Sequence, residues 1–116
     1  MPMALDHSVP AWSHLLEERE KRRGMKLPDA RRSVANKIGV SPGTLENLSR
    51  GRFKSLRLNI VEAIRNAVIR ELESEIAALS HELDLARQSG AHPASPEIIE
   101  AATAVQTARE LLKGAK

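Results

Sequence analysis

The chain of 116 residues contains no cysteine and very few aromatic residues: one Trp, one Phe and no Tyr. Without cysteine it can form no disulfide framework, no thiolate zinc site and no thiol nucleophile. A β-sandwich or β-barrel normally contains more aromatic and β-branched residues than this chain does. Ala, Leu, Glu, Arg and Lys are abundant instead, and this composition favours an all-α fold.

Long apolar runs are also missing from the sequence. No run approaches the ~18 residues that a membrane-spanning helix needs. The N-terminal residues do not have the basic segment followed by an apolar segment that marks a secretory signal. We therefore expect a soluble, cytoplasmic protein that does not contact membranes.

The sequence contains no pattern typical of a metal site or an enzyme active site. His7, His14, His81 and His92 are scattered, and none has a second ligand at metal-binding spacing. There is no glycine-rich phosphate loop, no nucleophile elbow and no pair of catalytic carboxylates. We expect no cofactor and no catalytic activity.

The net charge of +3 conceals an uneven distribution along the chain. Residues 1–60 contain twelve Lys or Arg and six Asp or Glu, whereas residues 61–116 contain six and nine. A basic half joined to a slightly acidic half is typical of a polyanion-binding domain attached to an assembly region. We predict a binding domain over residues 1–60 and an oligomerisation region over residues 61–116.

The stretch from Arg31 to Arg50 predicts a helix, a short turn and a second helix. Gly39 can take the left-handed conformation that ends the first helix and redirects the chain. Ser41 is a good N-cap, and Pro42 suits the first position of the second helix. The apolar residues that would form a small core are Val34, Ala35, Ile38, Val40, Leu45 and Leu48.

This pattern resembles the helix-turn-helix of phage repressors and lactose-repressor-like regulators. That family has an alanine four residues before the turn glycine and an aliphatic residue directly before and directly after the glycine. It also has aliphatic residues six and nine residues after the glycine. The matching residues are Ala35, Ile38, Val40, Leu45 and Leu48. The resemblance covers only residues 31–50, and an ordinary helical hairpin is the alternative. The resemblance to this family implies that the second helix enters the major groove of double-stranded DNA.

The resemblance, together with the polar residues around the second helix, predicts the DNA contacts. The base-reading residues are Gly43, Thr44, Glu46, Asn47 and Arg50, since Asn pairs with adenine and Arg with guanine. Glu46 could read cytosine or orient Arg50 through an intrahelical pair. The phosphate-binding residues are Arg31, Arg32, Lys37, Ser41, Arg52, Lys54 and Arg57.

A first helix is predicted from Pro10 to Arg23, with Trp12, Leu15 and Leu16 packed on the two helices that follow and with residues 1–8 loose. The charged run over residues 17–23 is interpreted as a solvated helix face. A backbone contact to DNA remains open for Arg22, Arg23 and Lys26.

The second half of the chain predicts a long helix that starts between Ser55 and Asn59 and ends at Ser89, before Gly90. A last helix, capped by Ser95 and ending at Lys113, could fold back on it as an antiparallel hairpin. From Leu72 the apolar residues step by four and three as in a coiled coil. Because such a hairpin leaves apolar surface on Ile69, Leu111 and much of the stripe over residues 60–72, we expect homodimerisation. The residues predicted for this interface are Ile64, Val68, Leu72, Ile76, Leu79 and Leu83.

These features together predict a small homodimeric, nucleoid-associated regulator that binds DNA as a transcriptional repressor, with no small-molecule effector evident. Two alternatives remain open. A phage-type small packaging (terminase-like) subunit also resembles a helix-turn-helix domain followed by a helical hairpin that assembles into a ring. A partition or conjugation accessory protein would mark a DNA site for other machinery. Solution mass separates the dimer from the ring.

Overall fold

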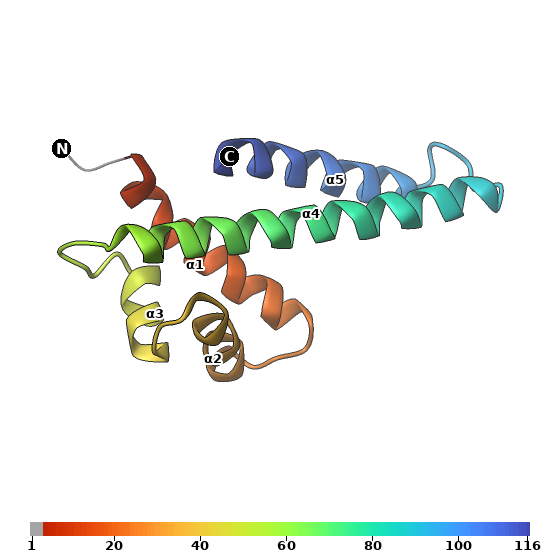
Figure 1. Cartoon of the computed structure of the whole chain (residues 1–116). Helices are drawn as coiled ribbons and strands as arrows, with labels where there is room; N and C mark the ends of the chain where they lie inside the picture. The colour runs from red at the N-terminus through yellow and green to blue at the C-terminus, as the bar shows by residue number, and fades with distance from the viewer. Residues whose placement is uncertain (1–3) are drawn as a thin grey trace. The chain divides into compact units, whose positions relative to one another are not determined.

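The structure, a computed structural model, describes residues 4–116, and the side chains from Ser8 onward. This part of the chain forms five α-helices and no strand, which confirms the predicted all-α fold (Figure 1). The helices are α1 (Ala4–Arg22), α2 (Leu27–Ile38), α3 (Pro42–Ser49), α4 (Leu58–Gln88) and α5 (Pro96–Ala115).

The helices belong to two compact units, Met1–Val68 and Ile69–Lys116. The boundary therefore falls inside α4, about two helical turns further along than the sequence predicted. The first turns of α4 belong to the first unit, and there Ile64 is fully buried and Val68 is 1% exposed. Both residues were predicted to form a dimer interface, but in this structure they are core residues.

Within the first unit, α2 and α3 are joined by the tight turn that the sequence predicted. Gly39 has φ 77° and ψ 32°, and its N–H and that of Val40 both donate to the carbonyl of Ala35, at 2.9 and 3.0 Å. This left-handed C-cap ends α2 as predicted. Helices α1, α2 and α3 all contact one another. Their buried apolar side chains are Val9, Leu16, Ala30, Val34, Ala35, Ile38, Leu45 and Leu48.

Helix α1 differs from the prediction in its start and in its buried face. It begins at Ala4, so that Pro10 lies inside the helix and the expected loose segment 1–8 is helical over the residues described. Val9 is fully buried, and this packing favours the additional turn ahead of Pro10. The buried stripe continues through Ser13 and Leu16, whereas Trp12 and Leu15 are only half-buried.

The interpretation of residues 17–23 as a solvated face is wrong for Glu17, which is only 3% exposed. Its Oε1 accepts a hydrogen bond from Ser49 Oγ at 2.9 Å and one from Arg31 Nε at 3.5 Å. A buried carboxylate is tolerated when it is paired and hydrogen-bonded. Glu17 therefore links α1 to both α2 and the end of α3.

The same correction applies to Glu20, which is also 3% exposed. It accepts hydrogen bonds from Arg23 Nη1 at 2.9 Å and from Lys37 Nζ on α2. Burial alone raises the pKa of the Glu20 carboxyl, but the hydrogen bond and charge of Lys37, with those of Arg23, outweigh it and the pKa lies below its ordinary value. The ionised form is thus the one that the fold stabilises.

In the second unit, the last part of α4 and α5 form an antiparallel hairpin (Figure 1). Leu83, Ile98 and Val105 form its core, and Ile76 and Leu79 pack against them. The apolar seam that predicted a coiled-coil partner therefore faces α5 of the same chain. Leu72 is fully buried as well. None of the residues predicted for dimerisation is exposed in this structure.

The ends of α5 correct two details of the prediction. Ser95 occupies the N-cap position, but its side chain makes no capping hydrogen bond. The helix continues through Gly114 to Ala115 instead of stopping at Lys113. Gly114 does not take a positive φ, so it does not end the helix as Gly39 does.

The crossing of α2 and α3 generates a stability prediction. Ala35 is fully buried, so Ala35→Leu should destabilise the fold by ~1–3 kcal/mol through overpacking. Gly39→Val should cost about 1–2 kcal/mol, since a β-branched residue is strained at φ 77° although no neighbouring atom would contact its Cβ. Urea denaturation measures both changes.

Gly43→Ala is the matched control, because Gly43 has no positive φ and open space around its Cβ position. It should leave stability unchanged or raise it by about 0.4–1 kcal/mol. If Gly39→Val and Gly43→Ala behaved alike, the left-handed cap would not stabilise this turn.

The ion pairs of Glu20 generate a prediction about pH. Because its pKa is lowered on folding, its contribution is present above the ordinary carboxyl pKa of 4.5 and is lost as the pH falls through the folded value. Glu20→Gln should therefore cost about 1–3 kcal/mol at neutral pH, and the difference from the wild-type chain should shrink on acidification. Urea midpoints measured from about pH 7 to about pH 3 test this.

Glu18→Gln serves as the control on the same helix, since the side chain of Glu18 is 38% exposed and its ion pairs among the described residues are with His14 and Lys21 of α1. It should change stability by less than about 1 kcal/mol at any pH. A difference between wild type and Glu20→Gln that stayed constant with pH would contradict the assignment.

Candidate nucleic-acid interface

The N-terminus of α3 is capped by Ser41, whose hydroxyl also hydrogen-bonds the side chain of Thr44 on the outward face of the helix. Ser41 Oγ accepts a hydrogen bond from the Thr44 backbone N–H at 3.1 Å and donates one to Thr44 Oγ1 at 2.9 Å. Leu45 and Leu48 are the buried residues of α3. The opposite face carries Gly43, Thr44 and further polar side chains, which are exposed. The beginning of α3 is therefore rigid and open to a ligand.

Farther along α3, Asn47 and Arg50 are both exposed, but they differ in their partners. The side-chain amide of Asn47 makes no hydrogen bond within residues 4–116. Arg50 Nη2 lies 2.9 Å from Glu46 Oε1, which is the intrahelical pair that the sequence offered as one role for Glu46. The second oxygen, Oε2, lies 3.9 Å from Arg31 Nη1 of α2. Glu46 thus lies between two guanidinium groups.

Of the residues predicted to bind phosphate, Ser41 caps α3, and the six basic residues fall into two groups. Arg31 and Lys37 pair with the buried carboxylates of α1, and Arg32 donates to Asp29 at 3.5 Å. Part of their charge is therefore already neutralised. By contrast, the side chains that follow α3 are exposed and have no partner among the described residues: Arg52, Lys54 and Arg57.

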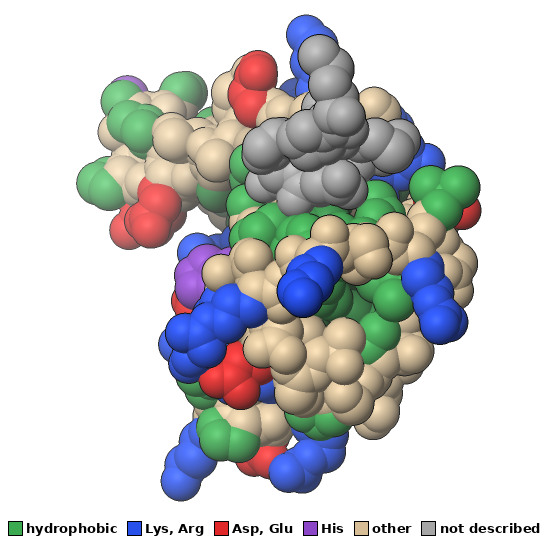
Figure 2. Space-filling view, turned by 90° about the vertical axis from the view of Figure 1, so that its left-hand side faces the viewer, with side chains coloured by type: hydrophobic (Ala, Val, Ile, Leu, Met, Phe, Trp, Pro, Cys, Tyr) green, Lys and Arg blue, Asp and Glu red, His purple; other side chains and the backbone are tan. Residues whose placement is uncertain are grey.

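Figure 2 views the side of the molecule on which α3 and the loop after it lie in Figure 1. Lys and Arg side chains stand out at several separate places on this face, with acidic, apolar and neutral surface between them. A spread of this kind suits a ligand with several anionic groups at intervals better than a single anion.

A pocket of about 260 Å³ lies where the beginnings of α2 and α3 meet. Its lining residues are Leu27, Pro28, Arg31, Arg32, Pro42, Gly43 and Glu46. Unpaired backbone N–H groups at helix N-termini favour anions, and the two arginines add positive charge. Glu46 opposes this effect. Because Arg31 and Arg32 line the pocket, it can accept an anionic oxygen.

The remaining candidates for a DNA backbone contact lie around the end of α1. Arg22, Arg23 and Lys26 are exposed, and Arg23 is paired with Glu20. The residues that sequence reasoning missed are Glu17 and Glu20. The buried stripe at positions 9, 13, 16, 17 and 20 would have revealed them, because its helical spacing places both carboxylates on the buried side of α1.

Among the described side chains, no three His, Cys, Asp or Glu are grouped so that they could hold a metal ion; His7 lies outside these side chains. No helix found within residues 4–116 combines the length and the apolar character that a membrane span requires.

The arrangement can therefore present one short helix, with an amide and a guanidinium exposed on it, flanked by basic side chains. These are groups that hydrogen-bond base edges and phosphates. Comparison of the chain with family models, curated proteins and solved structures finds no match.

Proposed function

We propose that the chain is a sequence-specific DNA-binding protein of the cytoplasm, a transcriptional repressor that places α3 in the major groove. The observation that carries the proposal is the outer face of α3, where Gly43 lies in the first turn, Asn47 is exposed in the last turn and Arg50 is exposed at the C-cap. Base edges are read by such amide and guanidinium groups on a helix that the groove can accommodate.

In the proposed complex, the N-terminal end of α3 approaches the bases first. Gly43 has no side chain and open space around it, so the duplex can come close to this turn. Asn47 would pair with adenine through its free amide. Arg50 forms an ion pair with Glu46 at 2.9 Å. It would bind guanine either while this ion pair orients its guanidinium group or after the ion pair has broken.

The phosphates would be bound chiefly by Arg52, Lys54 and Arg57. Their charges are uncompensated, whereas Arg31 and Lys37 share theirs with Glu17 and Glu20. Because phosphate binding depends on released counterions, a residue already paired within the protein releases fewer of them. Arg31 and Lys37 then act mainly as supports for α2 and α3.

A repressor of this size would read two half-sites as a dimer, since one α3 contacts only a few base pairs. The predicted seam residues are covered within the chain, so a partner would have to bind elsewhere. The second unit has large apolar side chains that are exposed, namely Leu85 at 52%, Ile99 at 53% and Leu111 at 42%. We propose that copies associate through this set of residues, and a dimer that uses one side of α5 would employ only one of Ile99 and Leu111.

The ring-forming packaging subunit remains a second candidate, and one observation favours it. Ile99 and Leu111 are both exposed on α5, yet their positions differ by about 120° around the helix axis. Apolar residues on two sides of a helix suit contacts with two neighbours. Head-to-tail contacts of that kind close into rings, whereas a two-fold dimer uses the same patch twice.

The proposed DNA contacts predict two distinct effects of mutation. With a preferred duplex selected from random DNA, Asn47→Ala or Arg50→Ala should lower its affinity by ~1–3 kcal/mol and leave scrambled DNA little affected. Arg52→Ala, Lys54→Ala or Arg57→Ala should weaken both duplexes and flatten the slope of log affinity against log salt by about one unit. Fluorescence anisotropy at several salt concentrations reports both quantities.

Melting temperatures provide the control, because all five side chains are exposed and their removal should not unfold the protein. Equal loss of affinity for both duplexes in the Asn47 and Arg50 variants would mean that α3 supplies attraction without reading sequence.

The two candidate functions predict different assemblies. Light scattering of a repressor dimer should give twice the chain mass of 12.8 kDa, and a ring should give a larger multiple. In a dimer that uses one side of α5, only one of Ile99→Glu and Leu111→Glu should reduce the mass. In a ring, either substitution should do so. A monomeric wild-type chain would exclude both forms of assembly.

A further inference from the structure

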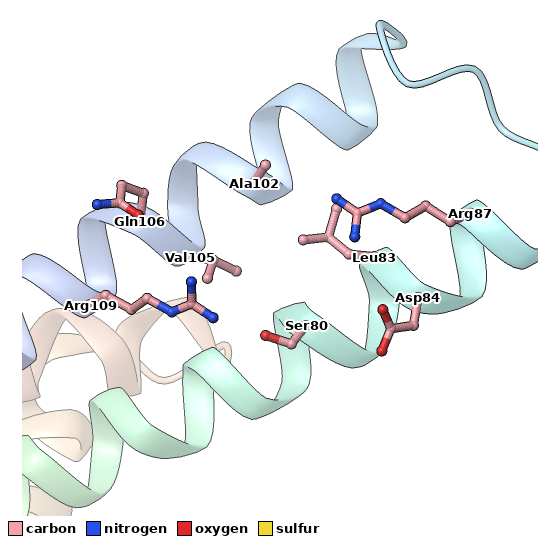
Figure 3. A pocket seen from close by; sticks show the side chains of 8 residues that line it. All are labelled: Ser80, Leu83, Asp84, Arg87, Ala102, Val105, Gln106 and Arg109. Carbon is pink, nitrogen blue, oxygen red and sulfur yellow. The ribbon is translucent and has the colours of Figure 1, made fainter.

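The hairpin of the second unit contains a pocket that the DNA-binding proposal does not use. It lies between α4 and α5, has a volume of about 310 Å³, and adjoins the core formed by Leu83 and Val105 (Figure 3). With Ala102, these two side chains provide an apolar surface between the helices. A volume near the lower end of the range for ligand sites suits a small molecule.

Two arginines give this pocket its charge. Arg87 extends from α4 and Arg109 from α5, and the two side chains reach into the space between the helices from opposite ends (Figure 3). Neither guanidinium forms a hydrogen bond or ion pair with any residue that the structure describes. Because arginine keeps its charge at all accessible pH values, its complement here is an anion.

The other polar groups of the pocket limit which anion can bind. Ser80 offers a hydroxyl, and Gln106 donates its amide N–H to Glu110 at 3.0 Å, which leaves its carbonyl oxygen free to accept. Asp84 also lines the pocket and repels a densely charged polyanion. A nucleic acid backbone is therefore a poor fit, whereas two anionic groups separated by a hydrocarbon segment match two separated arginines.

We propose that this pocket binds a small organic dianion of the short-chain dicarboxylate class. One carboxylate pairs with Arg87 and the other with Arg109, each through charge-assisted hydrogen bonds, and the carbon chain lies on Leu83, Ala102 and Val105. The proposal concerns the second unit alone and does not depend on DNA binding.

Isothermal titration of the full chain with succinate, glutarate and adipate, supported by thermal unfolding, tests the proposal. At least one of these should bind saturably and raise the melting temperature in a concentration-dependent way. Butyrate and valerate, which have one carboxylate, should bind about tenfold more weakly or less. Arg87→Gln and Arg109→Gln should each weaken dicarboxylate binding by about tenfold.

Arg70→Gln is the matched control, since Arg70 is an exposed arginine of the second unit that does not line the pocket. It should leave the affinity unchanged. Changes in the amide NMR signals of Ala102, Val105 and Gln106 on titrating the wild-type chain provide a second measurement that needs no variant.

The proposal is overturned if no dicarboxylate binds saturably, if butyrate binds as well as glutarate, or if Arg70→Gln weakens binding as much as Arg109→Gln. A reduction in solution mass on changing Arg87 or Arg109, without any ligand effect, would overturn it too. In that case the arginines would serve as a contact for carboxylates of a second copy of the chain.

Discussion

The pairing of Glu17 with Arg31 and Ser49 is the interaction on which the first unit depends most. One buried carboxylate connects three helices, because its partners lie on α2 and at the end of α3. Glu20 adds a second link to α2 through Lys37. A carboxylate left unpaired in this position would bear a large desolvation cost, so the helices are held in the one arrangement that satisfies both acids. The orientation of α3, and with it the exposed face that carries Asn47, follows from this constraint.

The same constraint divides the basic residues into two kinds. Positive charge near α3 is abundant, but Arg31 and Lys37 are paired with Glu17 and Glu20, whereas Arg52, Lys54 and Arg57 beyond α3 have no ion-pair partner among the described residues. Counting basic residues in the first half of the chain therefore overstates the attraction available to a polyanion. Glu46 acts in a similar way on a smaller scale, since it lies between Arg31 and Arg50.

Local signals in the sequence predicted local structure well, and contacts between distant segments poorly. Gly39, Ser41 and Pro42 have conformational preferences strong enough to fix the α2–α3 turn without help from the rest of the chain. The seam was also recognised, and the last helix was named as a candidate to fold back on it; Ile76, Leu79 and Leu83 do pack with residues of α5. The same seam residues were nevertheless assigned to a dimer interface, because periodicity shows that a helix has an apolar face and not which helix covers it. The burial of Glu17 and Glu20 was missed for a related reason. A charged residue looks solvated until its partners, here more than ten positions away in three of the four pairs, are brought beside it.

Helix α4 belongs to both units, and this has a consequence for how the chain unfolds. Its 31 residues form one uninterrupted hydrogen-bonded helix, with the division between the units inside it. Ending a helix in its middle exposes unpaired amides and carbonyls at the new termini, and helix formation is cooperative. If the core of one unit unfolded, the part of α4 that packs in the core of the other unit would therefore be destabilised as well. The two units are therefore expected to unfold at more similar temperatures than two domains joined by a flexible linker would. Amide hydrogen exchange is expected to be slowest near the centre of α4.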